Sequence, residues 1–352
     1  MRQLSVGLLG YGFASSVFHA PLISAIPGLK LERVASSNPQ AVLRDYPAAR
    51  VDADSSAIFA DPAIDLVVIA TPNTSHFPLA REALLAGKHV VVDKPFVISV
   101  AEGRELIALA TERGLQLSVF HNRRWDNDFL TVRRCMDSGL LGQVYNYESH
   151  FDRFVPGVDG RWREQPAPGA GVLFDLGSHL IDQALCLFGK PLSVLADIGT
   201  QRPQAQVDDY FHLLLDYGSL KVVLCSSMLV REPGPRFQVH GAEGSFIKYG
   251  LDSQEAALLR GEGPGHPQWG QDDSACYGKL SFEANGLQLN AEVETARGSY
   301  EAYYQGMYEA IVEGKAAPVS PQEALDVITV IEGAMRSHQE QSTIVFEWEG
   351  EK

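Results

Sequence analysis

The sequence contains few cysteines, and none of them forms a recognisable pair. Cys135, Cys186, Cys225 and Cys276 are widely separated, and no CxxC motif is present. Zinc knuckles and redox motifs need closely spaced thiols, so neither kind of site is indicated. We expect these four side chains to be reduced thiols in or near the core.

Basic residues are also scarce, and long apolar runs are lacking. Lys and Arg number 29 against 44 Asp and Glu, which gives a formal net charge of -15. This charge repels a phosphate backbone, and no basic run with interleaved aromatics offsets it, so nucleic acid is not an expected partner. No apolar run approaches the roughly 20 residues that cross a bilayer, and the first residues show no signal-peptide pattern. We therefore expect a cytoplasmic protein without a membrane partner.

The chain is long enough for two domains, since 352 residues exceed one ordinary core. In the first part, short β-rich runs alternate with helical patterns: strands are predicted at 4–9, 31–36, 65–70, 89–93 and 115–120, and helices at 77–87 and 99–114. Ser99 and Glu102 have capping-box spacing, and Gly114 ends the second helix. After Asp65, the strand predicted at 65–70 is fully apolar, which indicates burial on both faces, as in a doubly wound parallel sheet.

The pattern changes after about residue 121. Partly alternating runs at 143–152, 208–217, 220–228 and 342–348 predict longer strands of a mainly antiparallel sheet. Helical patterns at 127–139, 173–189, 299–314 and 321–338 are expected to cover one face of that sheet. The stretch at 261–273 is loop-like. The fold class is therefore predicted to be α/β.

A glycine turn follows the first predicted strand, in the stretch GLLGYGFASS at 7–16. Gly10 permits a tight bend, and Gly12 lets the backbone approach a pyrophosphate at the start of the next helix. Ser15 replaces the third glycine of the usual pattern, which is tolerable because that position serves close packing. A GxG turn can lack a ligand, but its place inside a βαβ unit favours a dinucleotide.

The end of the second predicted strand bears on which dinucleotide binds. NAD sites usually place a carboxylate there to bind the ribose 2′-hydroxyl. This strand instead ends in Ser36, Ser37 and Asn38, which can donate hydrogen bonds to a 2′-phosphate. Glu32 lies inside the strand and no arginine is adjacent, so NADP is expected as the preferred cofactor, with NAD as the other possibility.

Two further stretches lie where predicted strands end, ATPNTSHF at 70–77 and VVVDKPF at 91–97. Open α/β sheets bind their ligands at the carboxyl ends of the strands. Lys94 directly follows an apolar strand and precedes Pro95, a place that a solvated surface charge explains poorly. We expect a functional Lys94, with a structural or surface lysine as the alternative.

The helical pattern at 171–189 carries Asp175 and His179 four residues apart, on one face, with Asp182 and Gln183 close to that face. A carboxylate beside a histidine can orient the ring and select its tautomer. On this helix alone, a catalytic pair and an Asp–His pair satisfied in the core are equally compatible with the pattern. No metal is expected, because no cysteine or histidine neighbour completes a zinc site.

In combination, GYG at 10–12, ATPNTSH at 70–76, DKP at 93–95 and DLGSHLID at 175–182 resemble motifs of the glucose-fructose oxidoreductase and inositol dehydrogenase (Gfo/Idh/MocA) family. The family usually has Glu where this chain has Asp93. Within the family, GYGFASxxFHAP is most similar to NADP-dependent scyllo-inositol dehydrogenases. The resemblance covers essentially the whole chain. It implies a Rossmann domain over 1–121 and, over 122–352, a substrate-binding α/β domain with a large open sheet through which copies associate into homo-oligomers.

The resemblance also implies the roles of individual residues. Lys94 and His179 would be the catalytic pair, and Asp175 would help to bind the substrate and position the histidine. The implied cofactor-binding set, together with the residues predicted above, is Gly10, Gly12, Phe13, Ser36, Ser37, Asn38, Thr71, Pro72, Asn73, His76, Lys94 and Pro95.

Two loops are expected to shape a substrate pocket. Asn122 and Arg123 resemble positions that face the cofactor or the substrate in relatives. The Gly- and Pro-rich stretch at 153–171 contains Arg153, Trp162 and Arg163 and is interpreted as a lid over polyol hydroxyls. A solvated loop anchored by its tryptophan is the alternative.

The implied chemistry is reversible oxidation of a secondary alcohol on a cyclic polyol or sugar. His179 suits proton transfer because the unperturbed pKa of histidine is ~6.5, and the Lys94 ammonium would stabilise charge on the reacting oxygen. Two alternatives remain open: a non-catalytic NAD(P)-binding regulator, and a reductase of imine or tetrapyrrole substrates. His19 and the tyrosines at 300, 303, 304 and 308 are expected to pack rather than to catalyse.

Overall fold

The computed structural model describes residues 2–158, 160 and 164–348. The chain forms two compact units, which are described separately. The first contains residues 1–122, 254–269 and 299–325, and the second contains residues 123–253, 270–298 and 326–352. Within the described ranges, no helix is long and apolar enough to cross a membrane.

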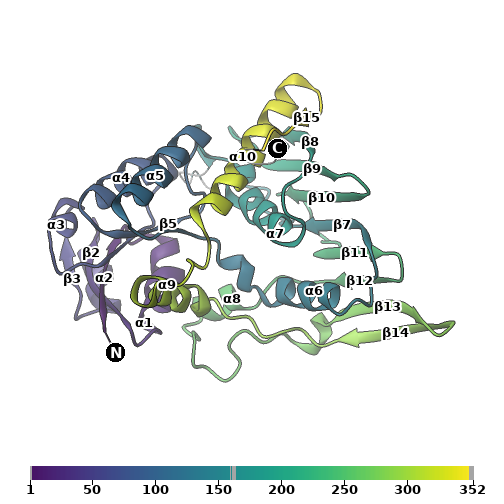
Figure 1. Ribbon diagram of the computed structural model, residues 1–352, viewed down its shortest axis with the longest axis horizontal. Coiled ribbons are helices and arrows are strands. Elements are labelled where there is room, and N and C mark those ends of the chain that lie inside the picture. The colour runs from purple at the N-terminus through teal and green to yellow at the C-terminus, as the bar shows by residue number, and fades with distance from the viewer. Residues whose placement is uncertain (1, 159, 161–163, 349–352) are drawn as a thin grey trace. The chain divides into compact units, whose positions relative to one another are not determined.

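The first unit is built on a six-stranded parallel sheet with the order β3-β2-β1-β4-β5-β6. The strand order reverses between β1 and β4, which is where open α/β sheets bind ligands. Figure 1 shows α4 and α5 side by side. The strands are β1 (Leu4–Leu9), β2 (Leu29–Ala35), β3 (Arg50–Asp52), β4 (Leu66–Ile69), β5 (His89–Asp93) and β6 (Leu117–Phe120). The α-helices are α1 (Ala20–Ser24), α2 (Pro39–Asp45), α3 (Ser56–Phe59), α4 (His76–Leu85), α5 (Val100–Arg113), α8 (Gln254–Leu259) and α9 (Glu301–Glu313).

Local sequence signals account for several of these elements. All four residues of β4 are completely buried, as the apolar run at 65–70 predicts. The Ser99 side chain accepts a hydrogen bond from the Glu102 N–H at 3.3 Å, and the Glu102 carboxylate accepts one from the Ile98 N–H at 3.2 Å. Gly114 ends α5 in the left-handed conformation with a φ of 63°. The predicted start and end of this helix are therefore confirmed.

The helix after the glycine turn differs from the ordinary Rossmann pattern. It begins as a π-helix, η1 (Ser15–His19), and only then continues as α1. Ser15, at the place of the missing third glycine, is completely buried. π-helical turns insert an extra residue and often occur at functional sites.

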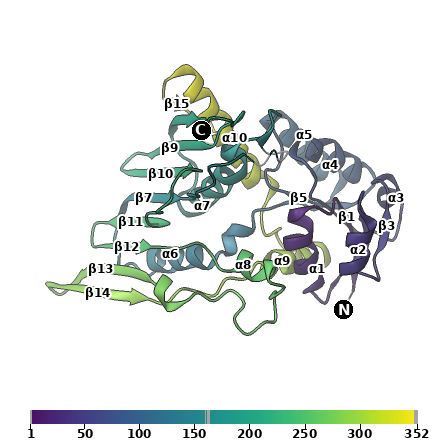
Figure 2. The same cartoon turned by 180° about the vertical axis from the view of Figure 1, so that it is seen from behind.

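The second unit is built on a nine-stranded sheet with the order β14-β13-β12-β11-β7-β10-β9-β8-β15. β7 and β10 pair in parallel, and the other neighbours are antiparallel, so the predicted mainly antiparallel sheet is confirmed. The strands are β7 (Val144–His150), β8 (Ser193–Gly199), β9 (Tyr210–Tyr217), β10 (Leu220–Ser227), β11 (Phe237–Gly241), β12 (Gly244–Lys248), β13 (Gly278–Ala284), β14 (Leu287–Val293) and β15 (Ile344–Val345). The hairpin of β13 and β14 extends beyond its neighbours in both views (Figures 1 and 2).

Helices pack on one face of this sheet. They are α6 (Asn127–Asp137), the π-helix η5 (Leu173–Gly177) with its continuation α7 (Ser178–Phe188), and the later part of α10 (Pro321–Glu340), which crosses from the first unit into the second. Aromatic side chains fill the layer between sheet and helix: the Tyr147 ring lies 5.2 Å from that of Phe188 in α7 and 6.0 Å from that of Phe237 in β11. Three short 3-10 turns lie in the connections: η2 (Asn73–Ser75), η3 (Asn122–Trp125) and η6 (Ser274–Cys276).

Two expectations about the second half need correction. The run at 342–348 forms only the two-residue strand β15. Beyond it, the Phe346 N–H donates to the Leu192 carbonyl at 2.9 Å and the Trp348 indole donates to the Pro191 carbonyl at 2.7 Å. The helix at 299–314 does not cover the large sheet. As α9 it belongs to the first unit, where Tyr303 donates to the Ser118 hydroxyl of β6 at 2.8 Å. The two units therefore alternate along the chain.

Candidate active site

The glycine turn of the first unit leaves room for a ligand. Gly10 has a φ of +86°, and a Cβ there would lie 2.8 Å from the Ala70 carbonyl oxygen, so only glycine fits. Gly12 is exposed, and a Cβ at this position would meet no atom within 4 Å. The neighbouring Phe13 ring is 52% exposed. These residues fit a dinucleotide, because a bare backbone at Gly12 allows the close approach that a pyrophosphate needs.

The loop after β4 lies beside this turn and is held in place by the buried His76. Thr71 and Pro72 are at least partly exposed, whereas Asn73 and His76 are buried. The His76 ring lies between two loops, with Nδ1 2.8 Å from the Pro95 carbonyl oxygen and Nε2 3.0 Å from that of Thr71. Burial lowers the pKa of His76, so the ring is held neutral and donates to one carbonyl at a time. His76 thus joins the loop after β4 to the loop that carries Lys94.

The polar stretch after β2 is arranged around the start of α2. Asn38 caps that helix by accepting from the Ala41 N–H at 3.2 Å, and the Ser36 hydroxyl accepts from the Asn38 N–H at 3.0 Å. Ser37 is exposed. One carboxylate near this strand end was missed: Asp52, at the end of the adjacent β3. Its carboxylate accepts two hydrogen bonds from the buried Arg33, at 2.6 and 2.8 Å. Both carboxylate oxygens are therefore already paired with Arg33.

Lys94 stands out from its surroundings at the end of β5. It is partly exposed, whereas Asp93, Pro95 and Phe96 are buried. Its backbone N–H donates to the Asp93 carboxylate at 2.9 Å, and the following peptide bond to Pro95 is cis. Lys94 is therefore the partly exposed residue of this turn, at the edge of the sheet.

In the second unit, Asp175 and His179 lie on the helical segment formed by η5 and α7. Asp175 is partly exposed and His179 is 5% exposed. Because Asp175 belongs to the π-helical turn, the spacing between these two residues is not that of a regular α-helix. This irregular turn could not be foreseen from the four-residue spacing.

Asp208, which sequence reasoning missed, anchors the start of this helical segment. Its carboxylate accepts from the Leu173 N–H at 2.7 Å, and its backbone carbonyl accepts from the Val172 N–H at 3.0 Å. Gly171 has a φ of +93°, and a Cβ there would lie 1.9 Å from the Asp208 carboxylate. Burial raises the pKa of Asp208 to about 6. The signal in the sequence was slight, since the two contacting segments are more than 30 residues apart.

The other polar residues of α7 hold the turn η3. Asp182 forms a bidentate ion pair with Arg124, at 2.8 and 3.0 Å. The Gln183 amide donates to the Arg123 carbonyl at 2.9 Å. Asp182 and Gln183 therefore fix the backbone of Arg123, a predicted substrate residue, against the helix that carries His179.

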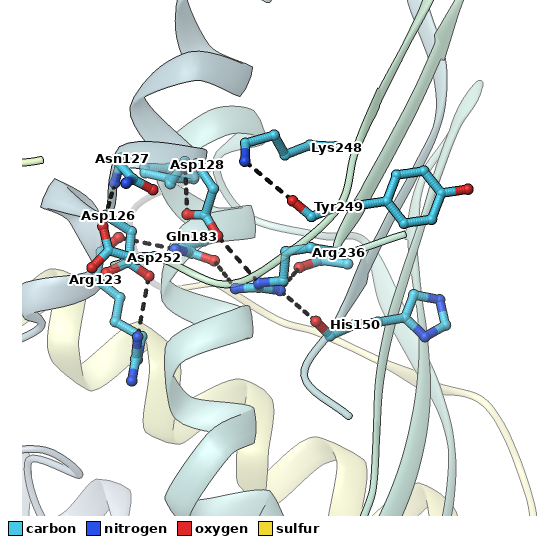
Figure 3. A network of polar contacts seen from close by, with 12 residues as sticks. Arg123, Asp126, Asn127, Asp128, His150, Gln183, Arg236, Lys248, Tyr249 and Asp252 are labelled. Carbon is cyan, nitrogen blue, oxygen red and sulfur yellow. Dashed lines mark hydrogen bonds and ion pairs between the residues drawn. The ribbon is translucent and has the colours of Figure 1, made fainter. Parts of the chain in front are cut away.

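A buried polar network links this helix to the sheet (Figure 3). Arg236 donates to the Gln183 amide oxygen at 3.1 Å, the Ser149 hydroxyl at 2.6 Å and the His150 carbonyl at 2.8 Å. Its Nε lies 3.6 Å from a carboxylate oxygen of Asp128, which is completely buried. Burial raises the pKa of Asp128, although the positive charges of Arg236 and Lys248 oppose that shift.

Lys248, the last residue of β12, extends the same network and is completely buried. Its ammonium group donates to the Asp272 carboxylate at 2.8 Å and to the carbonyls of Tyr249 and Cys276 at 3.1 and 2.5 Å. No sequence signal pointed to these charges, because Arg236 and Lys248 lie in strands or loops far along the chain from α6 and α7.

Two predicted substrate residues meet at one aromatic ring. The guanidinium groups of Arg123 and Arg153 lie 4.8 and 5.1 Å from the centre of the Phe151 ring. Arg123 also pairs with Asp126 at 3.3 Å. Asn122 is buried at the end of the first unit. Trp162 and Arg163 lie outside the described residues, so the predicted lid is described only in part.

The candidate residues are thus distributed over the two units. The glycine turn, the loop after β4 and Lys94 belong to the first, and Arg123, Arg153, Asp175 and His179 belong to the second. Among the described residues, no group of three or more His, Cys, Asp or Glu side chains is placed to hold a metal ion. The catalytic, cofactor and substrate roles of the individual residues stay predictions.

Comparison with known proteins gives concordant results. Residues 4–121 match the model of the oxidoreductase family's NAD-binding Rossmann fold, and residues 133–346 match that of its C-terminal α/β domain. The chain is 46% identical over 342 residues to the uncharacterized oxidoreductase YdgJ of Escherichia coli, covering 97% of this chain and 98% of that one. It is 43% identical over 344 residues to IolW of Bacillus subtilis, a scyllo-inositol 2-dehydrogenase (NADP(+)), covering 98% and 96%.

A solved structure shows the same likeness in three dimensions. The oxidoreductase yvaA from Bacillus subtilis superposes with a TM-score of 0.96 at 43% identity, covering 98% of this chain and 99% of the other. Sequence and structure therefore agree over both halves of the chain. The chain belongs to the Gfo/Idh/MocA oxidoreductase family, with an NAD-binding Rossmann domain followed by the family's C-terminal α/β domain.

Proposed function

We propose that this oxidoreductase oxidises a secondary alcohol of an inositol-like cyclic polyol or sugar, reversibly, with NADP as the preferred cofactor. The observation that carries the proposal is the partly exposed Lys94 among buried residues, at the same sheet edge as the open glycine turn. The substrate named for IolW supports the polyol class.

The residues around Gly10 and Gly12 would hold the dinucleotide, and its nicotinamide would supply the acceptor for the hydride of the carbinol carbon, or the donor in the reverse direction. His179 takes the hydroxyl proton as the C–O bond becomes a carbonyl, and gives it back during reduction. The Lys94 ammonium stabilises negative charge on that oxygen and helps to hold the alcohol in place. Asp175 binds the substrate and orients the imidazole of His179.

The preference for NADP rests on the strand end after β2. Ser36, Ser37 and Asn38 offer hydrogen-bond donors, and Asp52 is engaged by Arg33. A free carboxylate at that place would favour a ribose hydroxyl and repel a 2′-phosphate. The cofactor named for IolW supports the same preference.

Steady-state turnover tests the proposal directly. Reduced nicotinamide is measured with NADP and, separately, with NAD, against inositol isomers, aldoses and related polyols. We expect turnover that favours NADP and falls about 10²- to 10⁴-fold in Lys94→Ala and in His179→Ala, the range for loss of a catalytic acid, base or charge. The exposed residue Lys30 gives a matched control for the lysine, and Lys30→Ala should retain the wild-type rate.

The result also separates the alternatives. Tight NADP binding without turnover on the whole panel would contradict the enzyme and support a regulator of the same fold. Reduction of an imine or tetrapyrrole without oxidation of any polyol would replace the substrate class.

We further propose that copies associate through the open face of the large sheet. Leu195 of β8, Leu214 of β9 and Val223 of β10 are direct cross-strand neighbours on the face opposite the helices, and Leu195 is 44% exposed. Contiguous apolar side chains of this kind favour burial against a partner. Sedimentation of the purified protein as a single copy would contradict the association.

A further inference from the structure

A cluster of buried polar side chains in the first unit has no part in the proposed mechanism. His19 of η1, Asp93 at the end of β5 and Tyr304 of α9 come together there, and none of them is more than 8% exposed. The His19 Nδ1 lies 2.6 Å from the Tyr304 hydroxyl oxygen. The other ring nitrogen, Nε2, lies 3.6 Å from the Asp93 carboxylate, an electrostatic contact longer than a hydrogen bond.

The chemistry of the three groups sets the direction of these contacts. Burial raises the pKa of Tyr304 well above its usual value, and the negative charge of Asp93 adds to the shift. The phenol is therefore protonated and donates to Nδ1 of His19. The proton of a neutral His19 then lies on Nε2, facing the Asp93 carboxylate. Tyr304 thus selects the tautomer of His19 that stabilises Asp93.

Asp93 connects this cluster to Lys94. Its carboxylate accepts from the Lys94 N–H at 2.9 Å. Burial alone would raise the pKa of Asp93, but the contact with His19 and the positive charge of Lys94 lower it below its usual value. The carboxylate is therefore ionised. Its negative charge and the positive charge of Lys94 stabilise each other.

We propose that Tyr304 and His19 are positioning residues for Lys94. They hold the Asp93 carboxylate, and that carboxylate fixes the backbone from which the Lys94 side chain extends. In the reaction they touch neither substrate nor cofactor. This inference rests on the proposed function for its catalytic consequence, whereas its structural content concerns only the first unit.

The next residue of the same helix provides a matched control. Tyr303 is as completely buried as Tyr304, but its hydroxyl donates to the Ser118 hydroxyl of β6 at 2.8 Å, whereas that of Tyr304 contacts His19. Tyr303→Phe and Tyr304→Phe each remove one buried hydroxyl and keep the ring. Both should lower stability by the amount typical of one lost hydrogen bond, and only the second should reach Lys94.

The first measurement needs no turnover. Lysine amines are reductively dimethylated with ¹³C-formaldehyde and a borohydride reductant, and the Lys94 resonance is identified as the one missing in Lys94→Arg. We expect that resonance to move, and the pH at which it titrates to shift, in Tyr304→Phe and in His19→Leu. It should keep its wild-type position in Tyr303→Phe. In His19→Gln the amide can still donate to Asp93, so the change should be partly reversed.

The second measurement is steady-state kinetics over a range of pH. We expect Tyr304→Phe to lower kcat about tenfold and to displace its pH profile, with little change in KM, while Tyr303→Phe stays within about twofold of wild type. An unchanged Lys94 resonance in both Tyr304→Phe and His19→Leu would overturn the inference, whether or not the protein turns over. Equal losses of kcat in the two tyrosine variants would also overturn it. An inactive wild type whose Lys94 resonance responds as expected would contradict the proposed function alone.

Discussion

The two units build their share of the candidate site by different means. In the first, Gly12, Thr71 and Lys94 lie on loops at the carboxyl ends of parallel strands, and their backbone is shaped by the turns themselves. In the second, His179 lies on a helix that buried charges, chiefly Arg236 and Asp128, attach to the sheet. A loop at a sheet edge can be altered without disturbing the core, whereas a buried charge that loses its partner destabilises the whole unit.

The largest loss of stability is expected when the buried polar network of the second unit is disrupted. Arg236→Met removes a buried guanidinium that bonds Gln183, Ser149 and His150, and it leaves Asp128 without its nearest positive charge. Loss of one partner of a buried ion pair typically costs about 3–5 kcal/mol, so we expect a fall of that size in the free energy of unfolding in denaturant.

The control for this change is Arg231→Met. Arg231 is exposed and stacks on the Phe154 ring at 3.9 Å, so its loss should alter stability by less than about 1 kcal/mol. Equal losses in the two variants would contradict the importance of the buried network.

An intermediate effect concerns the anchor of the helix start. Because the folded pKa of Asp208 is about 6, above its unfolded value near ~3.9, the folded state binds this proton more tightly. The resulting stabilisation is complete below the unfolded pKa and is lost as pH rises from about 4 through about 6. We expect the stability of wild type relative to Asp208→Asn to fall by about 1–2 kcal/mol over this interval, since partial solvent access reduces the full value.

Chemical denaturation at pH 4, 5, 6 and 7 measures this difference. Asp137→Asn, at an exposed position near the end of α6, serves as the control and should show a nearly constant difference from wild type. A constant difference for Asp208→Asn as well would show that its carboxyl titrates normally.

The smallest effect on stability is expected in the first unit. A methyl group at Gly12 meets no atom of the protein, so Gly12→Ala should leave the midpoint of thermal unfolding nearly unchanged. Because the same methyl would occupy the approach of a pyrophosphate, we expect NADPH affinity to fall at least tenfold, which corresponds to ~1.4 kcal/mol. Fluorescence titration of NADPH measures the affinity.

Gly10→Ala sharpens the contrast. Its positive φ and the nearby Ala70 carbonyl make a side chain strained there, so this variant should lose about 1–2 kcal/mol of stability. Unaltered NADPH binding in Gly12→Ala would mean that the turn does not receive the cofactor.

The features that the sequence predicted best are those determined by residues close together in the chain. The bend at Gly10, the caps of α5 and the buried strand β4 depend on residues within a few positions, and all appear in the structure. The prediction that Lys94 is functional rests on the same kind of signal, because an apolar strand followed by Lys-Pro is itself a local pattern.

Contacts between distant segments could not be predicted in this manner. Nothing near Arg236 indicates that it will bond Gln183, and nothing near Asp208 indicates that it will anchor residues 172 and 173. The helix α9 has the amphipathic pattern that either unit could bury, so its periodicity did not show that it would pack with β6. His19 was correctly expected to pack, but its polar partners, Asp93 and Tyr304, follow only from the fold.

The alternation of the two units along the chain also has a consequence during synthesis. The chain passes from one unit to the other at 122/123, 253/254, 269/270, 298/299 and 325/326. When the ribosome has delivered β6, the first unit still lacks α9, whose Tyr303 and Tyr304 bond Ser118 and His19. The first unit therefore stays incomplete until most of the chain has been synthesised, although its parallel sheet is synthesised first.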